Sequence, residues 1–300
     1  MMTSLFPSGA RFLRGNLHTH STRSDGANSP EEVCRIYREA GYDFLALTDH
    51  FMDRYGFPIT DTRPFRRDGF TTLISAELHA PQTELGELWH MTAFGLPDDF
   101  APIAPDETGP EVSRRCMAAG AFVAIVHPGW YGLTEADADT VEAHAVEVYN
   151  HTSHILQDRG DGWYLLDRLC AKGRRLSALA VDDAHMHSPD VFGAWVMVAA
   201  EENDPDQIVA ALKAGRHYST QGPDLRRIEI DGDDLVIECS PVDAIMVLGV
   251  GSRSENELGA GLIRARLPLA KFRESGWCRV AVADAAGKRA WSNPLTLPGN

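Results

Sequence analysis

Cysteine is scarce in this 300-residue chain, and its five cysteines are far apart. They are Cys34, Cys116, Cys170, Cys239 and Cys278, and no two of them form a CxxC pair. An odd number of scattered cysteines argues against a disulfide framework and against a zinc site built from thiolates. Any metal ion would therefore depend on histidine and carboxylate ligands.

Long apolar runs and an excess of positive charge are missing as well. No apolar run approaches the roughly 20 residues that span a bilayer, and the start, MMTSLFPSGARFLRG, lacks the apolar centre of a signal peptide. We therefore expect a soluble, cytoplasmic protein without a membrane partner. The formal net charge of −15 argues against binding to a nucleic-acid polymer, which needs a basic surface. A small anionic substrate stays open, because bound divalent cations would reverse the local charge.

Short apolar runs alternate with helix-like segments from about residue 11 to residue 221. The first helix is expected to begin at the N-cap Ser29, with Pro30 at N1 and Glu32 completing a capping box, and to stop at Gly41. Such alternation predicts an α/β fold whose parallel sheet is long enough to close into a barrel. The expected strands are 44–48, 71–76, 89–95, 121–126, 145–149 and 175–181, and the further helices are 111–119, 135–144, 163–171 and 206–214.

From Pro223 onward the pattern changes to short strand-like runs separated by Gly-rich turns. Asp231-Gly232 between two such runs is a hairpin signal. No strong helix pattern appears in this part. We therefore predict two domains, residues 1–222 and a small all-β domain of the sandwich type at residues 223–300.

Histidines and carboxylates fall at the ends of the expected strands. His18 and His20 are two residues apart, and residues at this spacing point to the same face of an extended strand. The complete set of candidate metal ligands is His18, His20, Asp25, His50, Glu77, His90, His127, Asp183 and His185. A set of imidazoles and carboxylates without sulfur suits Mn²⁺, Fe²⁺ or Zn²⁺ and disfavours Ca²⁺. The sequence therefore predicts a hydrolytic metal site.

Several positions in this set have an ordinary alternative, since Glu77 could be a solvated acid after a strand and His127 could merely shape a turn before Pro128. His90 lies inside an expected strand, where a histidine can equally be a hydrogen-bonded core residue. Asp183 is preferred to Asp182 because Asp183 and His185 are two residues apart and share a face. The remaining histidines are expected at the surface or behind the ligands, and they are His79, His144, His151, His154, His187 and His217.

As an ordered set, these motifs resemble those of the polymerase-and-histidinol-phosphatase (PHP) superfamily of metal-dependent phosphoesterases. The matching pieces are HTHSTRSDG at 18–26, TDH at 48–50, Glu77, HPG at 127–129 and DDAH at 182–185, over roughly residues 12–221. The resemblance implies a distorted (βα)₇ barrel with a centre of two or three divalent ions. It also implies a hydrolase.

The resemblance further implies how the ions are shared. The implied sets are His18, His20, Glu77 and Asp183 for one ion, Glu77, His90 and His127 for a second, and Asp25, His50 and His185 for a third. Some members place another ligand on the strand that here ends EVYNH. Glu147, Asn150 and His151 therefore leave the number of ions open.

A mechanism follows from the chemistry of bound water. Coordination lowers the pKa of water from 15.7 to about 7, so a hydroxide bridging two ions is expected to attack phosphorus in line. His185 and Asp183 are the predicted catalytic residues, and His187 is an alternative proton donor to the leaving group. Arg23 is expected to bind an anionic substrate in bidentate fashion.

Three functions remain open at this point. The first is a metal-dependent phosphoesterase acting on a small phosphate ester. The tail AWSNPLTL resembles a PHP branch that includes a carbamate-insecticide hydrolase, so a carboxylic or carbamate ester hydrolase on the same barrel is the alternative. The third is a docking module without activity. A segment at residues 51–70 is either a lid or a solvated loop, and it holds Arg54, Arg63, Arg66 and Arg67.

Overall fold

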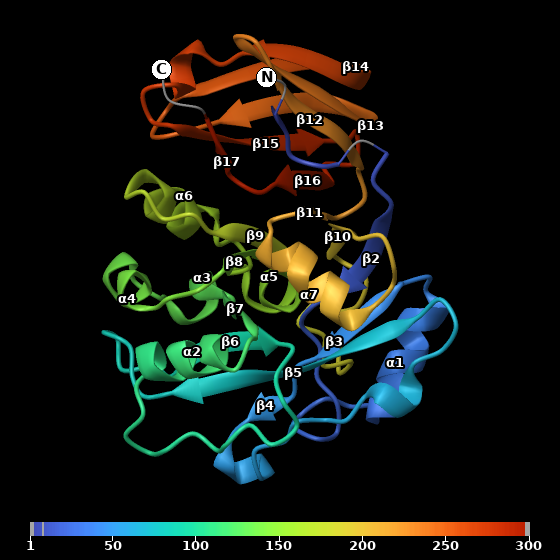
Figure 1. Ribbon diagram of the computed structural model, residues 1–300, viewed down its shortest axis with the longest axis vertical. Helices are drawn as coiled ribbons and strands as arrows, with labels where there is room; N and C mark the ends of the chain where they lie inside the picture. The colour runs from blue at the N-terminus through green and yellow to red at the C-terminus, as the bar shows by residue number, and fades with distance from the viewer. Residues whose placement is uncertain (1–2, 8, 298–300) are drawn as a thin grey trace.

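The computed structural model describes residues 3–7 and 9–297 as a mixed α/β protein. The strands that follow residue 224 gather at one end of the molecule together with the N-terminal segment, and the α-helices and the strands from residue 12 to residue 220 lie below them (Figure 1). No helix in the described ranges is long and apolar enough to cross a membrane. The α/β class predicted from the sequence is confirmed.

One sheet carries the strands that the sequence predicted before residue 222. Phe44–Leu47 and Phe122–Ile125 are buried throughout, as strands covered on both faces are. In spatial order the strands are β11 (His217–Thr220), β10 (Trp195–Ala199), β2 (Phe12–Asn16), β3 (Phe44–Leu47), β5 (Thr71–Ala80), β6 (Trp89–Phe94), β7 (Phe122–Ile125), β8 (Ala145–Asn150) and β9 (Ser177–Val181). A short strand β4 (His50–Phe51) pairs with β5.

The sheet is mixed, so the prediction of a parallel sheet is wrong in part. The pairs β2–β3, β3–β5, β7–β8 and β8–β9 are parallel. The pairs β5–β6 and β6–β7 are antiparallel, as are β2–β10 and β10–β11. The physical reason at β5–β6 is the short connection at residues 81–88, which holds no helix and can only fold the chain back on itself.

The two ends of this sheet approach each other without a continuous ladder. Between β9 and β11 the Ser219 hydroxyl accepts from the Ala180 N–H and donates to the Ala178 carbonyl, both at 2.9 Å. Beyond the ends of β2 and β9, Thr19 and Ala184 form an isolated parallel bridge. The strand ladders of the described residues therefore leave the sheet unclosed, and the predicted barrel is not confirmed.

The helices largely follow the expected positions. Ser29 caps the first helix by accepting from the Glu32 N–H at 3.3 Å, but the Glu32 carboxylate pairs with Arg35 and does not complete a capping box. The helix expected at 135–144 is shorter. The helices are α1 (Pro30–Glu39), α2 (Gly109–Ala118), α3 (Pro128–Tyr131), α4 (Glu135–Thr140), α5 (His151–Gln157), α6 (Trp163–Ala171) and α7 (Pro205–Lys213), with 3₁₀ turns η1 (Asp53–Tyr55), η2 (Arg63–Phe65) and η3 (Ala270–Phe272).

The C-terminal strands surround an apolar cluster to which Phe6 and Tyr218 also contribute. Gly232, at φ +64°, turns the predicted hairpin between β12 and β13. Two strand-like runs of the sequence, DLVIECS and AIMVLGV, merge into one long β13, whose register shifts after Glu238, next to Pro241. The strands are β12 (Leu225–Asp231), β13 (Asp234–Leu248), β14 (Ser254–Pro268), β15 (Trp277–Ala283), β16 (Arg289–Ser292) and β17 (Leu295–Thr296). Pairing of β11 with β16, and of β1 (Thr3–Ser4) with β12, continues the sheet into this part, so the boundary at 222/223 stays a prediction.

A buried arginine attaches the C-terminal strands to α6. Arg279 on β15 donates two hydrogen bonds of 2.8 Å to the Asp167 carboxylate. Its guanidinium also lies 3.8 Å from the centre of the Trp163 ring. A bidentate ion pair with an aromatic platform fixes the orientation of both elements.

We expect Arg279→Met to lower the free energy of unfolding by about 2 kcal/mol, because Asp167 loses a charged partner in a half-buried place. Denaturant unfolding of Arg279→Met, Asp167→Asn and the double variant measures the coupling. If the two single effects simply add, the pair contributes nothing and this prediction is wrong.

Candidate metal centre

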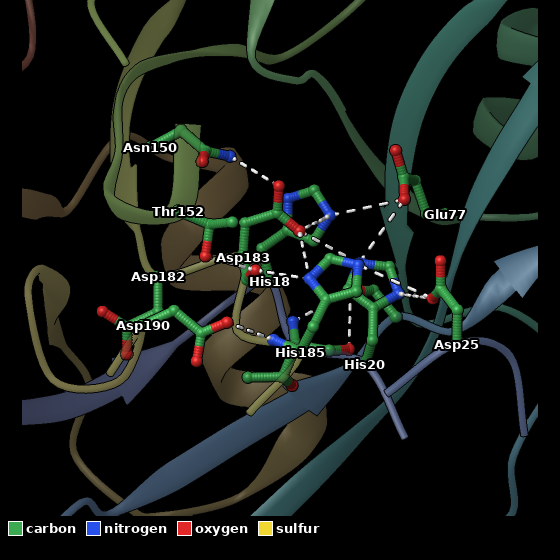
Figure 2. Close-up of polar contacts among 12 residues, drawn as sticks. His18, His20, Asp25, Glu77, Asn150, Thr152, Asp182, Asp183, His185 and Asp190 are labelled. Carbon is green, nitrogen blue, oxygen red and sulfur yellow. Dashed lines mark hydrogen bonds and ion pairs between the residues drawn. The ribbon is translucent and has the colours of Figure 1, made fainter. Parts of the chain in front are cut away.

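Most of the candidate ligands lie near the ends of strands, whereas Glu77 lies inside β5 and Asp25 lies in the loop after β2. His18 and His20 follow β2, His127 follows β7, and Asp183 follows β9. Figure 2 shows the side chains of His18, His20, Glu77 and Asp183 pointing toward one another from separate elements. Within the described residues, their ligand atoms form four overlapping groups, and a fifth group adds His79, with all atoms of a group within 4.8 Å of one another.

Glu77 lies at the centre of this cluster and is fully buried. Its Oε1 is 2.8 Å from His90 Nδ1 and 3.1 Å from His127 Nε2. Its Oε2 is 2.7 Å from His50 Nδ1 and 3.5 Å from His18 Nε2. One carboxylate thus faces histidines on two sides, so Glu77 would be available to more than one cation held by these histidines.

Asp183 joins the histidines of the first motif. Its Oδ1 lies 3.2 Å from His18 Nε2 and 3.0 Å from His20 Nε2. Its Oδ2 accepts from Asn150 Nδ2 at 3.0 Å. Asp183 has φ +56° and His127 has φ +28°, in a region that non-glycine residues rarely adopt. Backbone strain of this kind is typical of functional sites, and here it turns both side chains into the cluster.

The neighbouring Asp182 turns away from the histidines. Its carboxylate accepts from the Tyr37 hydroxyl at 2.7 Å and from the Gly193 and Ala194 N–H groups at 2.8 and 3.0 Å. Burial raises the pKa of Asp182 to about 6, although these donors oppose the rise. Asp182 therefore holds the segment after β9 in place, while Asp183 presents the ligand atoms.

Asp25 gathers a separate group of histidines. Its oxygens lie 3.3 Å from His50 Nε2, 3.6 Å from His185 Nε2 and 3.8 Å from His20 Nδ1. The His20 and His185 rings stack at 4.1 Å between centres. His20 therefore offers one nitrogen to Asp183 and the other to this group.

The grouping differs in part from the implied one. Glu77, His90 and His127 come together as implied, and Asp25, His50 and His185 do so with His20 added. The set implied for the first ion separates into two groups. One group holds His18, His20 and Glu77, and the other holds His18, His127 and Asp183.

Two buried side chains of the site, His79 and Glu147, lie outside the predicted set of metal ligands. His79 Nε2 lies 2.9 Å from His50 Nδ1, and His79 forms a group with His50 and Glu77. Glu147 Oε1 lies 2.6 Å from His18 Nδ1, and its Oε2 accepts from the His127 N–H at 2.8 Å. A carboxylate behind a histidine orients the ring for its metal ion. Glu147 therefore positions ligands from behind.

The surroundings set the charge of these rings. Burial lowers the pKa of His20 to about 3, and the nearby His185 and His50 act in the same direction. For His50, burial also acts to lower the pKa, but the Glu77 and Asp25 carboxylates raise it to about 10. The cluster thus concentrates carboxylates that attract positive charge, whether protons or metal ions.

Several ligand atoms in the described part of the chain are buried without a hydrogen-bond partner. They include His18 Nε2, His20 Nδ1, His127 Nδ1, Asp25 Oδ1 and Glu77 Oε2. Buried polar atoms are rarely left unpaired, since each costs free energy. Imidazole and carboxylate atoms aimed at one another across short distances fit divalent cations. The residues present therefore suit a metal centre.

A buried carboxylate holds the loop that carries Asp25. Asp49 accepts from the Ser21 N–H at 2.7 Å and from the Ser24 and Thr60 hydroxyls at 2.9 Å each. The same turn needs Gly26, since a Cβ there would lie 2.5 Å from the His20 carbonyl oxygen. Sequence reasoning assigned no role to Asp49 although it lies inside the TDH motif.

We expect Asp49→Ala to weaken metal binding at the Asp25 group by about 10- to 100-fold, because the loop loses its anchor. Titration calorimetry with Mn²⁺ on the metal-free protein measures the change. The matched control is Asp68→Ala, which removes an exposed carboxylate elsewhere. Equal affinity in the two variants would contradict the anchoring role.

The ligand cluster lines a cavity of about 850 Å³. Arg54, on η1, lies in the wall of this cavity, and its guanidinium is 4.6 Å from the centre of the Tyr55 ring, which stacks on His50. Arg23 is exposed and lies outside the residues that line the cavity, so its role in substrate binding stays a prediction. Arg63 pairs with Asp61 and Asp98, away from the cavity lining.

No protein-family model and no curated protein matches the sequence. Solved structures do match. A two-domain protein containing a predicted PHP-like metal-dependent phosphoesterase from Bacteroides vulgatus is similar over 97% of both chains, with a TM-score of 0.53 and 15% identity. An amidohydrolase from Chromobacterium violaceum, solved with sulfate and no metal, matches 59% of this chain and 89% of its own at 16% identity and a TM-score of 0.46. The first similarity confirms the resemblance to PHP-like proteins at the level of the fold.

Proposed function

We propose that this protein is a metal-dependent phosphoesterase that hydrolyses a small phosphate ester. The observation that carries the proposal is the convergence of the predicted ligands around the buried carboxylate of Glu77, in the wall of an 850 Å³ cavity. The name of the Bacteroides protein, which shares the fold, agrees with a metal-dependent hydrolase.

Two or three divalent ions, from among Mn²⁺, Fe²⁺ and Zn²⁺, would be held by the grouped histidines and carboxylates. Bound there, they would supply Lewis acidity and water of lowered pKa. Glu147 keeps His18 in a fixed orientation through its 2.6 Å contact. Arg54 offers a positive charge to a substrate anion in the cavity.

The leaving oxygen needs a proton, and two histidines in the cavity wall are placed to supply it. His185 lies with Nδ1 2.9 Å from the Asp183 carbonyl oxygen. His187 lies with Nε2 2.8 Å from the Asp25 carbonyl oxygen, which leaves its other nitrogen for a substrate. In this proposal His185 is the donor when its Nε2, 3.6 Å from Asp25, holds no ion, and His187 is the donor when His185 serves as a metal ligand. Asp183 positions the histidines of the first motif.

The test measures initial rates of the Mn²⁺-loaded protein on three esters, which are 4-nitrophenyl phosphate, bis(4-nitrophenyl) phosphate and 4-nitrophenyl acetate. We expect phosphate turnover, lost in His18→Ala and Asp183→Ala and kept in Asp68→Ala. A metal-loaded protein that hydrolyses no phosphoester removes the proposal.

A carboxylic or carbamate ester is the second candidate substrate. The observation that favours it is the apolar part of the cavity wall, formed by Met52, Leu88, Trp130 and Leu156, which suits an uncharged ester. Acetate turnover that needs metal, without phosphate turnover, would decide for this alternative.

A further inference from the structure

An exposed apolar wall flanks the ligand cluster. Leu88 precedes β6, Trp130 lies on α3 and Leu156 lies on α5, and all three line the cavity. Their exposed fractions are 38%, 37% and 55%. These side chains come from three separate elements and meet at one cavity, so each leaves apolar surface in water that an occupant would cover.

Trp130 lies directly beside two candidate ligands. Its ring centre is 5.5 Å from that of His90 and 5.3 Å from that of His127, with nearly perpendicular planes. Both histidines also contact Glu77. A molecule whose reactive group sits at Glu77, His90 and His127 therefore brings its next atoms against the indole of Trp130.

We propose that the substrate carries an aromatic ring next to the ester, and that the ring packs against Trp130 with Leu88 and Leu156 at its sides. The inference rests on the proposed function for the ester itself. A cavity of about 850 Å³ has room for a ring-bearing molecule as well as the reacting group. An aromatic ring gains from a tryptophan partner beyond the burial of apolar area.

The concave shape of the apolar wall favours a small molecule over a partner protein as its occupant. The apolar side chains line the same concave space as Asp25, Glu77 and Asp183. An occupant of this space that reaches the apolar wall also reaches the ligands. A partner protein would instead need an apolar patch on the outer surface.

The test uses phosphonates, which contain no ester bond and are not hydrolysed. Titration calorimetry on Mn²⁺-loaded protein compares 2-phenylethyl-, 2-cyclohexylethyl- and ethylphosphonate. We expect the phenyl compound to bind about 10-fold more tightly than the ethyl compound and about 3-fold more tightly than the cyclohexyl compound. Trp130→Ala and Leu156→Ser, both at exposed positions, should each remove most of the phenyl preference. Tyr164→Ala, at an aromatic residue on α6 with a 78% exposed side chain, should keep it.

The outcomes separate this inference from the proposed function. Equal affinity for the three phosphonates overturns the aromatic site, whatever the ester assays show. A phenyl preference that survives in both Trp130→Ala and Leu156→Ser also overturns it, because the ring then lies elsewhere. A phenyl preference that both variants lose supports the site, even if 4-nitrophenyl phosphate is not hydrolysed and only the proposed reaction fails.

Discussion

Glu77→Gln should lower kcat/KM for metal-dependent hydrolysis by at least about 10⁴-fold, the largest loss we expect from any single substitution. The reason is that Glu77 contacts histidines of several groups at once, with His90 and His127 on one oxygen and His50 on the other. Glutamine keeps the size of the side chain but replaces one carboxylate oxygen by an NH₂ group, which cannot bind a cation, and it removes the negative charge. The bridge between two ions would then be lost.

The measurement pairs steady-state rates with the metal content of the purified variant. We expect at least one ion fewer per chain in Glu77→Gln than in the unchanged protein. Glu87→Gln is the matched control, since Glu87 is exposed and lies outside the cavity lining. Activity of Glu77→Gln within tenfold of the unchanged protein would show that Glu77 does not bridge the ions.

Removal of the metal ions should lower the melting temperature by about 10 °C. Binding at about 1,000 times the dissociation constant stabilises a fold by about 4 kcal/mol, and each kcal/mol moves the midpoint of a chain of this size by about 2–4 °C. The structural basis is the buried set of imidazole and carboxylate atoms of His18, His20 and Glu77 that make no hydrogen bond within the described residues, because bound cations would give these atoms the ligand contacts they lack. The binding free energy thereby becomes folding free energy.

Calorimetric scans of the protein after dialysis against chelator, with and without added Mn²⁺, measure this difference. His18→Ala and Asp183→Ala should show a much smaller gain on addition of Mn²⁺, because each lacks a ligand of the cluster. An unchanged melting temperature in the original protein would mean that the cluster holds no ion under those conditions.

Much of the local structure could be predicted from the sequence. Apolar runs marked most of the strands, and the helix expected at 163–171 begins and ends where α6 does. The relative direction of neighbouring strands was harder to predict from the sequence. The loop at 81–88 lacked a helix pattern, yet the regular alternation around it suggested parallel strands, whereas β5 and β6 form an antiparallel pair.

The site was predictable to the extent that its residues fall at strand ends. Contacts between distant segments were not, and the pair of His18 and Glu147 spans 129 positions of sequence. His79 had a readable signal, since it lies two residues after Glu77 on one strand and so shares its face. Arg54 lies in the cavity wall because η1 carries it there, which the sequence did not indicate, while the role predicted for Arg23 stays a prediction.

The isolated bridge between Thr19 and Ala184 has a consequence for the mechanical integrity of the protein. The Asp183 N–H donates to the His18 carbonyl at 3.0 Å, and the His20 N–H donates to the Ala184 carbonyl at 2.8 Å. These few bonds join segments that are more than 160 positions apart. An ion shared by His18 and Asp183 would fasten the same junction through side chains. The metal centre would then hold the two segments together. In the metal-free protein we expect residues 18–20 and 183–185 to separate first, and a protease to cleave the chain first in these segments.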